Sequence, residues 1–212
     1  KTTFLKFLAI QCNQSNFQSE RIPIFIDLKA FARYCERLSE FSLMQYMIEE
    51  LSICEILEEK IKKLLIQGRL LILLDGLDEV KLDAGKQVLI DVENFSTKFF
   101  KNQYVITCRI AAPFANRLLN LDFTNVEVAD LNQQQIKVFA NKWFIAVQRD
   151  IKKYGFFKAN EFIKKLYLPE NKRIAELAVT PILLNLICLV FQEYSKFPPK
   201  RSKLYKQGLG IL

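Results

Sequence analysis

The chain has 212 residues, a net charge of +8 and 50% hydrophobic residues, so it can build one substantial core or a domain with a smaller appendage. This composition excludes a disordered protein. The longest apolar segment, residues 181–191, is interrupted by Asn185 and is far shorter than the ~20 residues that cross a bilayer. We therefore expect neither a membrane span nor a signal peptide. Because the chain does not start with Met, we expect it to be a fragment.

Five cysteines are scattered along the chain without a Cys-x-x-Cys pair, and the chain contains no His. Zinc sites and His-based catalytic triads are thereby excluded. The apolar surroundings of these cysteines favour reduced, buried thiols in a cytoplasmic protein. Lysines alternate with glutamates through most of the chain, so we interpret the positive charge as a solvated surface and rank nucleic-acid binding last. The cysteines are Cys12, Cys35, Cys54, Cys108 and Cys188.

The chain opens with Lys1-Thr2-Thr3, followed by Phe4, Leu8 and Cys12 at the spacing of an amphipathic helix. This pattern places Lys1 and Thr2 at a helix N-terminus, where free backbone N–H groups and the helix dipole favour anions. A lysine adds a point charge for phosphate, and a hydroxyl adds an oxygen ligand for a metal ion.

The next part of the chain alternates between apolar β-type runs and helical periodicity. Strands are predicted at residues 22–28, 70–74, 103–108 and 125–129, and helices at residues 41–66 and 88–99. From residue 131 onward only helical spacing is found, including an apolar helix from Pro181 to about Tyr194. The sequence therefore predicts an α/β domain with a parallel sheet over residues 1–130, followed by an all-α domain over residues 131–212.

The stretch Arg69–Val80, RLLILLDGLDEV, is the centre of the prediction. Its apolar run is typical of a strand buried on both faces of a parallel sheet, and such strands lead to a ligand crevice at the carboxyl edge. The acidic residues after it can hold a cation, or they can form a polar turn on leaving the core. Arg109, which follows the strand at 103–108, is expected at the same edge, where it meets an anionic ligand or pairs with surface acids.

This order of elements resembles a P-loop NTPase core that lacks its first strand and glycine loop. Lys1-Thr2-Thr3 would complete the GxxxxGK[ST] motif. Residues 70–79, LLILLDGLDE, resemble the modified Walker B motif of NACHT-domain NTPases, in which a tiny residue follows the magnesium-binding Asp. Residues 105–109, VITCR, resemble the sensor strand of that family, although Ile110 stands where a Pro is usual. Residues 180–184, TPILL, resemble its helical-domain segment.

The resemblance implies a nucleotide site that binds ATP or GTP with Mg²⁺. Lys1, with Thr2 and Thr3 beside it, would contact the phosphates, and Thr2 and Asp75 would complete the magnesium shell. Pro181 would pack near the base, although it is also suited to an ordinary first helical position.

The same resemblance implies catalytic roles for three residues. Asp78 or Glu79 would orient the attacking water, and the choice between them is open. Arg109 would sense the γ-phosphate. We expect weak or no nucleotide binding by residues 1–212 alone, because the glycine loop that cradles the phosphates is missing.

At the level of function, the resemblance implies a slow, switch-type NTPase of the STAND class of signal-transduction ATPases, closest to bacterial and cyanobacterial NACHT proteins. Its helical part would act as a lid, and the switch would control homo-oligomerisation and so bring together fused sensor and effector domains in defence or regulation. One alternative is a catalytically silent scaffold that only holds nucleotide. The other is nucleic-acid binding, motivated by the net charge and by Lys196, Lys200, Arg201, Lys203 and Lys206.

Overall fold

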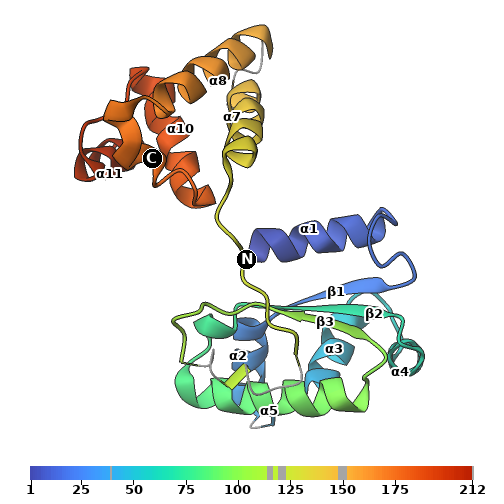
Figure 1. The fold of residues 1–212 in the computed structure, drawn as a ribbon. Coiled ribbons are helices and arrows are strands. Elements are labelled where there is room, and N and C mark those ends of the chain that lie inside the picture. The colour runs from blue at the N-terminus through green and yellow to red at the C-terminus, as the bar shows by residue number, and fades with distance from the viewer. Residues whose placement is uncertain (39, 114–116, 119–122, 148–151, 212) are drawn as a thin grey trace. The chain divides into compact units, whose positions relative to one another are not determined.

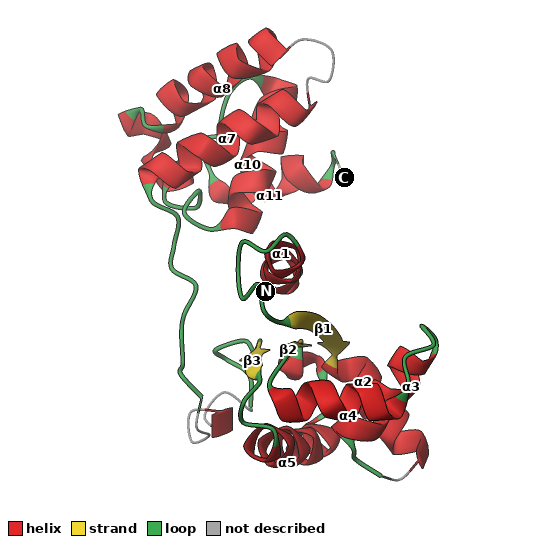
Figure 2. Ribbon diagram, turned by 90° about the vertical axis from the view of Figure 1, so that its right-hand side faces the viewer, coloured by secondary structure: helices red, strands yellow, loops and turns green. Residues whose placement is uncertain are grey.

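The structure is a computed structural model that describes residues 1–38, 40–113, 117–118, 123–147 and 152–211. It divides into two compact units, Lys1–Asn125 and Val126–Leu212. The first unit combines a parallel sheet with helices, and the described part of the second unit contains helices and no strand (Figure 2). The fold class predicted from the sequence is confirmed, whereas the roles of residues 1–130 as NTPase core and 131–212 as lid stay a prediction.

The sheet has three parallel strands in the order β1-β2-β3. They are β1 (Ile22–Asp27), β2 (Leu70–Asp75) and β3 (Gln103–Ile106). The register pairs Asp27 with Asp75 and Leu74 with Ile106, so the carboxyl ends of all three strands meet at one edge. The connections between these strands therefore deliver their first residues to a common place, which is the usual ligand-binding edge of such a sheet.

Strand β2 is buried along its whole length because helices cover both of its faces (Figure 1). Leu71 and Leu73 point to one face, where they pack against Leu5 and Cys12 of α1 (Thr2–Asn13). The alternate residues of the strand point to the other face and belong to the large core under the remaining helices. A strand with two buried faces must be apolar at every position, which explains the uninterrupted run from Leu70 to Leu74.

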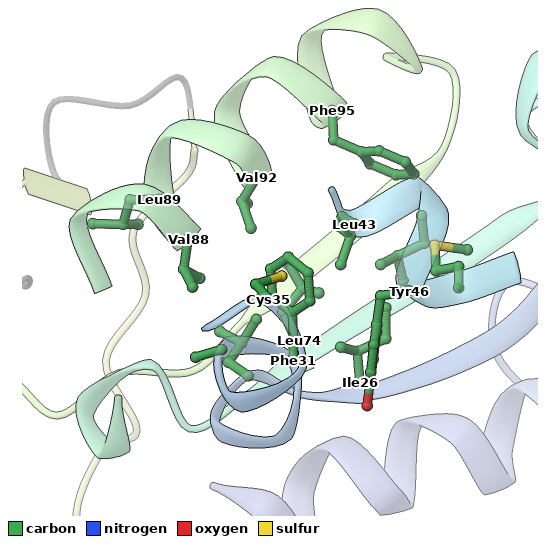
Figure 3. Packing of buried hydrophobic residues seen from close by; sticks show 14 of the residues in the cluster. Ile26, Phe31, Cys35, Leu43, Tyr46, Leu74, Val88, Leu89, Val92 and Phe95 are labelled. Atoms are coloured by element: carbon green, nitrogen blue, oxygen red, sulfur yellow. The ribbon is translucent and has the colours of Figure 1, made fainter. Parts of the chain in front are cut away.

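Four helices cover the second face of the sheet: α2 (Leu28–Leu38), α3 (Leu43–Ser52), α4 (Glu58–Gln67) and α5 (Leu82–Lys98). Figure 3 shows how side chains of α2, α3 and α5 pack together against the strands. Phe31 lies at the centre of this core, and its ring centroid is 5.3 Å from that of Tyr46. The residues that Figure 3 labels are Ile26, Phe31, Cys35, Leu43, Tyr46, Leu74, Val88, Leu89, Val92 and Phe95.

The single helix predicted over residues 41–66 is wrong, because the chain forms α3 and α4 with a turn between them. Glu55 in this turn has a φ of 59°, a left-handed conformation that a continuous helix cannot contain. The apolar spacing continues across the turn through residues that turn out to be exposed, such as Cys54 and Leu57, so periodicity alone did not reveal the break. Gly68 ends α4 in the left-handed conformation, as predicted.

The strand predicted at residues 125–129 is also wrong, because this segment is irregular. Its alternation reflects no buried face, since Val126 is 89% exposed and Val128 is 76% exposed. Within the described residues, β3 pairs with β2 and has no second partner strand. A period of two predicts a strand only when a neighbouring strand supplies the ladder, which local sequence cannot show.

The second unit contains α7 (Gln133–Val147), α8 (Lys152–Leu166), α9 (Lys172–Ala175), α10 (Pro181–Tyr194) and α11 (Arg201–Leu209), with one 3₁₀ turn, η2 (Pro169–Asn171), before α9. Its core is centred on Phe144, Phe162 and Phe191, whose ring centroids lie 5.3–6.1 Å apart. Aromatic pairs at this separation add to the free energy of burial. In the part of the chain that the structure describes, every helix is too short or too polar to cross a membrane.

All five cysteines are free thiols, as expected. Cys12, Cys35 and Cys188 are buried, whereas Cys54 is exposed in the turn after α3, which corrects the expectation that all of them are buried. Burial raises the pKa of the Cys35 thiol, and it does the same for Cys188. These two thiols are therefore neutral, unreactive core groups.

Asn102 connects two helices to the sheet, and its replacement tests the packing of the first unit. The side chain is buried and donates to the carbonyl oxygens of Leu65 (2.8 Å) and Phe99 (2.9 Å), while its Oδ1 accepts from the N–H of Leu70 (3.0 Å). Asn102→Ala leaves the N–H of Leu70 without this partner, whereas the carbonyl oxygens of Leu65 and Phe99 still accept from the N–H of Gly68 and the hydroxyl of Tyr104. We therefore expect the free energy of unfolding to fall by about 1–3 kcal/mol in a urea titration.

The matched control is Asn125→Ala, since the side chain of the exposed Asn125 makes, among the described residues, one hydrogen bond, to the carbonyl oxygen of Phe123 (3.1 Å). This change should lower the free energy of unfolding by less than about 0.5 kcal/mol. Equal effects of the two substitutions would contradict the structural role assigned to Asn102.

Candidate functional site

The site begins where β2 ends, at the Asp75-Gly76 step. Gly76 has a φ of 77°, and the chain then turns into a short 3₁₀ helix, η1 (Leu77–Glu79). A left-handed residue at this point reverses the backbone at little steric cost only if it is glycine. Leu77 is fully buried and holds the turn against the core, which leaves Asp78 and Glu79 at the carboxyl edge of the sheet.

Thr107, the first residue after β3, fastens this turn. Its hydroxyl donates to Oδ1 of Asp75 (2.6 Å) and accepts from the N–H of Gly76 (3.0 Å). Its backbone N–H donates to the carbonyl of Leu74 (2.9 Å), and its own carbonyl accepts from the N–H of Leu77 (3.1 Å). Four hydrogen bonds from one residue therefore determine the direction of the Asp75 carboxylate and of the backbone that follows it.

Asp78 lies between two cations that come from distant parts of the chain. Its Oδ1 accepts from Nζ of Lys1 at 2.9 Å and from the backbone N–H of Arg109 at 3.0 Å, and its Oδ2 is 2.9 Å from Nε of Arg109. The Asp78 side chain is 7% exposed. The structure thus brings together Lys1, Asp78 and Arg109, three residues that the sequence assigned to one site.

The charge of Asp78 is stabilised by these neighbours. Burial alone would raise the pKa of this carboxyl, but the hydrogen bond and the charge of Lys1, followed by those of Arg109, outweigh burial and lower the pKa below its ordinary value. Asp78 is therefore ionised at neutral pH, and both of its oxygens are occupied. A carboxylate in this state is a weak base and a strong anchor for cations.

Glu79 has different surroundings, although it is the next residue. Its side chain is 53% exposed, and its Oε2 lies 3.7 Å from Nζ of Lys29 on α2. Oδ1 of Asp27, at the end of β1, accepts from the N–H groups of Lys29 (2.8 Å) and Ala30 (3.1 Å) and so caps α2. The two acids that the sequence left as alternatives thus face different partners.

Lys1, Thr2 and Thr3 lie at the start of α1, as predicted, with Lys1 as the N-cap residue. The first turn of α1 contains no acidic residue, and all three side chains are exposed. This helix start offers N–H groups, two hydroxyls and an ammonium group to an anion. Pro181 occupies the first position of α10 in the second unit, and its nucleotide contact stays a prediction.

Asp75 is suited to bind Mg²⁺, because it is a carboxylate with one oxygen, Oδ2, that is available to a ligand. It is 8% exposed, and Thr107 uses its Oδ1, while Oδ2 accepts no hydrogen bond from any described residue. The described residues contain no group of three or more His, Cys, Asp or Glu side chains that could hold a metal ion without further ligands. Magnesium in phosphate sites takes one or two protein oxygens together with phosphate and water, and Asp75 and Thr2 supply ligands of this kind.

Two residues of this edge were not found from the sequence. In the sequence, nothing but its place before Cys108-Arg109 indicates a role for Thr107. Its role depends on the pairing of β3 with β2. Asp27 could have been found, since an N-cap residue stands directly before the helical spacing of Leu28, Phe31 and Cys35. The strand predicted over residues 22–28 ends at Asp27, and residues 28–38, where no helix is predicted from the sequence, form α2.

Comparison with protein families adds to this geometry. The NACHT domain matches residues 1–147 of the chain. The protein belongs to the NACHT family. Comparisons with curated proteins and with solved structures gave no significant match. The match includes Lys1, the β2 stretch and Arg109, and it identifies the chain as a nucleoside triphosphatase-type signalling module, a class that generally binds nucleotide with magnesium.

Because of the ion pairs of Asp78, the free energy of unfolding of this NACHT domain should depend on pH in the acid range. Asp78→Asn removes the charge that Lys1 and Arg109 share, so we expect the free energy of unfolding to fall by about 1–2 kcal/mol at neutral pH. The pKa of Asp78 is lower in the folded state than in the unfolded state. The stabilisation that its ion pairs provide is therefore complete above the unfolded-state pKa and is lost as pH falls through the folded-state pKa. The difference between variant and wild type in urea titrations should shrink below about pH 4.

Glu93→Gln is the control, because it changes an exposed carboxylate in the middle of α5. It should alter the free energy of unfolding by less than about 0.5 kcal/mol over the same pH range. A difference between Asp78→Asn and wild type that stays constant down to strongly acid pH would contradict the ion-pair assignment.

Proposed function

We propose that this chain is the nucleotide switch of a signalling protein, which binds and slowly hydrolyses ATP, or alternatively GTP, with Mg²⁺. One observation carries the proposal: Lys1 and Arg109 converge on a single, nearly buried carboxylate, that of Asp78, at the carboxyl edge of a parallel sheet. Two cations directed at one point, beside a helix N-terminus, form a site for a phosphate group. Family membership supports the same conclusion.

In this proposal Lys1 and the first N–H groups of α1 bind the phosphates, with Thr3 beside them. Thr2 and Asp75 would hold a magnesium ion, which would supply positive charge next to the phosphates. The hydrogen bond from Thr107 keeps Oδ1 of Asp75 engaged and presents Oδ2 to the ligand side. The guanidinium of Arg109 lies 2.9 Å from the carboxylate of Asp78, which also binds Lys1. We propose that Arg109 senses the terminal phosphate from this position.

We assign different roles to the two acids of η1. Asp78 positions Lys1 and Arg109, since both of its oxygens bind cations and its pKa is lowered. Glu79 orients the attacking water, because it is half exposed and its one ion pair with the residues that the structure describes is the long contact with Lys29. This assignment follows from the surroundings of each carboxylate, which the sequence could not distinguish.

The second unit completes the proposal as a lid. Pro181, at the first position of α10, is proposed to contact the base, and exchange or hydrolysis of the nucleotide is proposed to change the relation of lid and core. The change would control homo-oligomerisation and bring fused sensor and effector domains together. We propose a bacterial defence or regulatory role for such a protein.

Nucleotide hydrolysis by the full-length protein tests the proposal. Asp75→Ala removes the carboxylate ligand of the magnesium ion and should lower kcat at least about 100-fold. Glu79→Gln should lower kcat by a similar factor with little change in KM, because it removes the group that orients water but no group that binds nucleotide. Asp78→Asn should change KM as well as kcat, since it releases two cations that contact the phosphates.

Glu93→Gln on α5 serves again as the control and should leave both constants unchanged. Turnover that is unaffected by Asp75→Ala and by Glu79→Gln would refute the enzymatic part of the proposal. Nucleotide binding without turnover in the wild type would favour the silent scaffold.

A second candidate function, binding of a nucleic-acid backbone, is favoured by one feature of the helical unit. Lys172 and Arg173 of α9 and Lys200 and Arg201 at the start of α11 surround a hollow of about 690 Å³. Glu176 also lines it and is engaged, because its Oε2 lies 2.6 Å from Nη2 of Arg201. Cations at a helix N-terminus are repelled by the helix dipole, so a bound anion would stabilise this cluster.

Fluorescence anisotropy with a labelled single-stranded RNA tests this second candidate on residues 1–212. If it holds, binding weakens with salt, and Lys172→Gln with Lys200→Gln reduces the slope of log K against log salt by about 1.4. Lys137→Gln, on the exposed side of α7, is the control and should change affinity much less. Binding that is insensitive to the double substitution would remove this candidate.

A further inference from the structure

A cavity lies at the edge of the sheet opposite to Asp78, where β2 and β3 begin. Its volume is about 450 Å³, within the range of small-molecule sites. The cavity lies between the C-terminal ends of α4 and α5, and α4 is marked at that end of the sheet in Figure 1. Its apolar lining consists of Met44, Leu65, Ile66, Phe99 and Phe100. Nothing in the proposed nucleotide function uses this edge.

The walls of the cavity are cross-linked to the sheet, so the cavity is built into the fold. Asn102 joins the carbonyl oxygens of Leu65 and Phe99, one from each wall. Arg21 uses Nη1 to bind the carbonyl oxygens of Gly68 (2.7 Å) and Lys101 (3.0 Å), which follow the two walls in the chain. A site held in this way loses little conformational entropy when a ligand enters.

The rim of the cavity is basic. Lys62, Lys98 and Lys101 line it, and no acidic residue does. Lys62 is paired with Glu58, whereas the ion pairs found among the described residues include neither Lys98 nor Lys101. Lys98 also lies in the last turn of α5, where the helix dipole favours a cation, but Lys101 lies beyond the helix. The Nζ of Lys98 also lies 5.4 Å from the centroid of the Phe99 ring, a cation–π distance. Lys101 is therefore the rim lysine for which the described residues supply neither an ion pair nor a cation–π contact.

Large apolar side chains remain in water beside these lysines. Phe100 is 73% exposed and Ile66 is 64% exposed, while Leu65 and Phe99 form the buried floor. Exposed apolar surface that adjoins an apolar cavity and a charged rim is typical of a binding site. The apolar lining and the basic rim together define the ligand. A purely polar anion would not fill the apolar cavity, and an uncharged hydrocarbon would not pair with the lysines.

We propose that this cavity binds a small organic anion with an apolar body, of the class of medium-chain or aromatic carboxylates. The apolar body packs on Met44, Leu65 and Phe99, and the carboxylate lies beside Lys98 and Lys101. The site is separate from the nucleotide edge, because β2 begins at Leu70 beside the cavity and ends at Asp75 beside Asp78. A ligand here would not contact Lys1 or Arg109, which pair with Asp78 at the carboxyl edge.

Titration of residues 1–212 with sodium decanoate, followed by calorimetry, tests the proposal. We expect saturable binding at submillimolar concentration, with decan-1-ol and acetate binding far more weakly because each lacks one half of the ligand. Lys98→Gln with Lys101→Gln should weaken decanoate binding about fivefold or more, which corresponds to about 1 kcal/mol. Phe100→Ser should weaken it as well, and because this side chain is largely exposed the variant should remain folded in a thermal unfolding control.

The matched control is Lys60→Gln, which removes an exposed lysine of α4 that does not line the cavity. It should leave decanoate affinity unchanged. Absence of saturable decanoate binding, equally tight binding of decan-1-ol, or equal weakening by Lys60→Gln would each overturn the proposal. Binding of an acidic amphipathic peptide without binding of decanoate would assign the cavity to a protein partner and would overturn it too.

Discussion

The hydrogen bonds of Thr107 are the interaction on which the carboxyl edge of the sheet depends. The backbone of Thr107 pairs with Leu74 and Leu77, and its hydroxyl bridges Asp75 and the N–H of Gly76. These polar groups lie at the end of a buried strand, where an unpaired donor or acceptor costs about 1–3 kcal/mol. Pairing them through one residue of the neighbouring strand holds the turn in a single conformation. The position of Asp78, and with it that of Lys1 and Arg109, follows from this turn.

The two acids of η1 have different electrostatic surroundings at this edge. Asp78 is nearly buried and binds two cations, whereas Glu79 stays half exposed near Lys29. The two carboxylates are adjacent in sequence, but the 3₁₀ turn of η1 directs them to different sides. In the proposed switch, an incoming phosphate competes with Asp78 for Lys1 and Arg109. Exchange of one anion for another is a physical route by which bound nucleotide can be coupled to the conformation of the turn.

The two edges of the sheet have different chemistry because helices end at one of them and begin at the other. At the carboxyl edge, the starts of α1 and α2 present N–H groups, and the side chains are charged. At the opposite edge, the ends of α4 and α5 come together, and Asn102 and Arg21 pair the carbonyl oxygens there. This pairing keeps an apolar cavity open between the helix ends, with lysines around it. Membership of the NACHT family supports the function proposed for the first edge, and the proposal for the second edge rests on its own residues.

Much of this protein was determined by sequence alone. A strand buried on both faces must be apolar at every position, so β2 was readable, and Asp75, Gly76, Asp78 and Glu79 could be placed at its carboxyl end. The helix at Lys1, the strand before Arg109 and the first residue of α10 followed from similarly local patterns. Predictions failed where a pattern needed a distant partner: the alternation at residues 125–129 met no neighbouring strand, and the apolar stripe at residues 41–66 continued across a turn. Only the tertiary structure decided that Thr107 fastens the turn and that Asp78, not Glu79, binds Lys1 and Arg109. The reason is that these contacts join residues far apart in the chain, and their geometry exists only once the register of β2 and β3 and the position of α1 have been set.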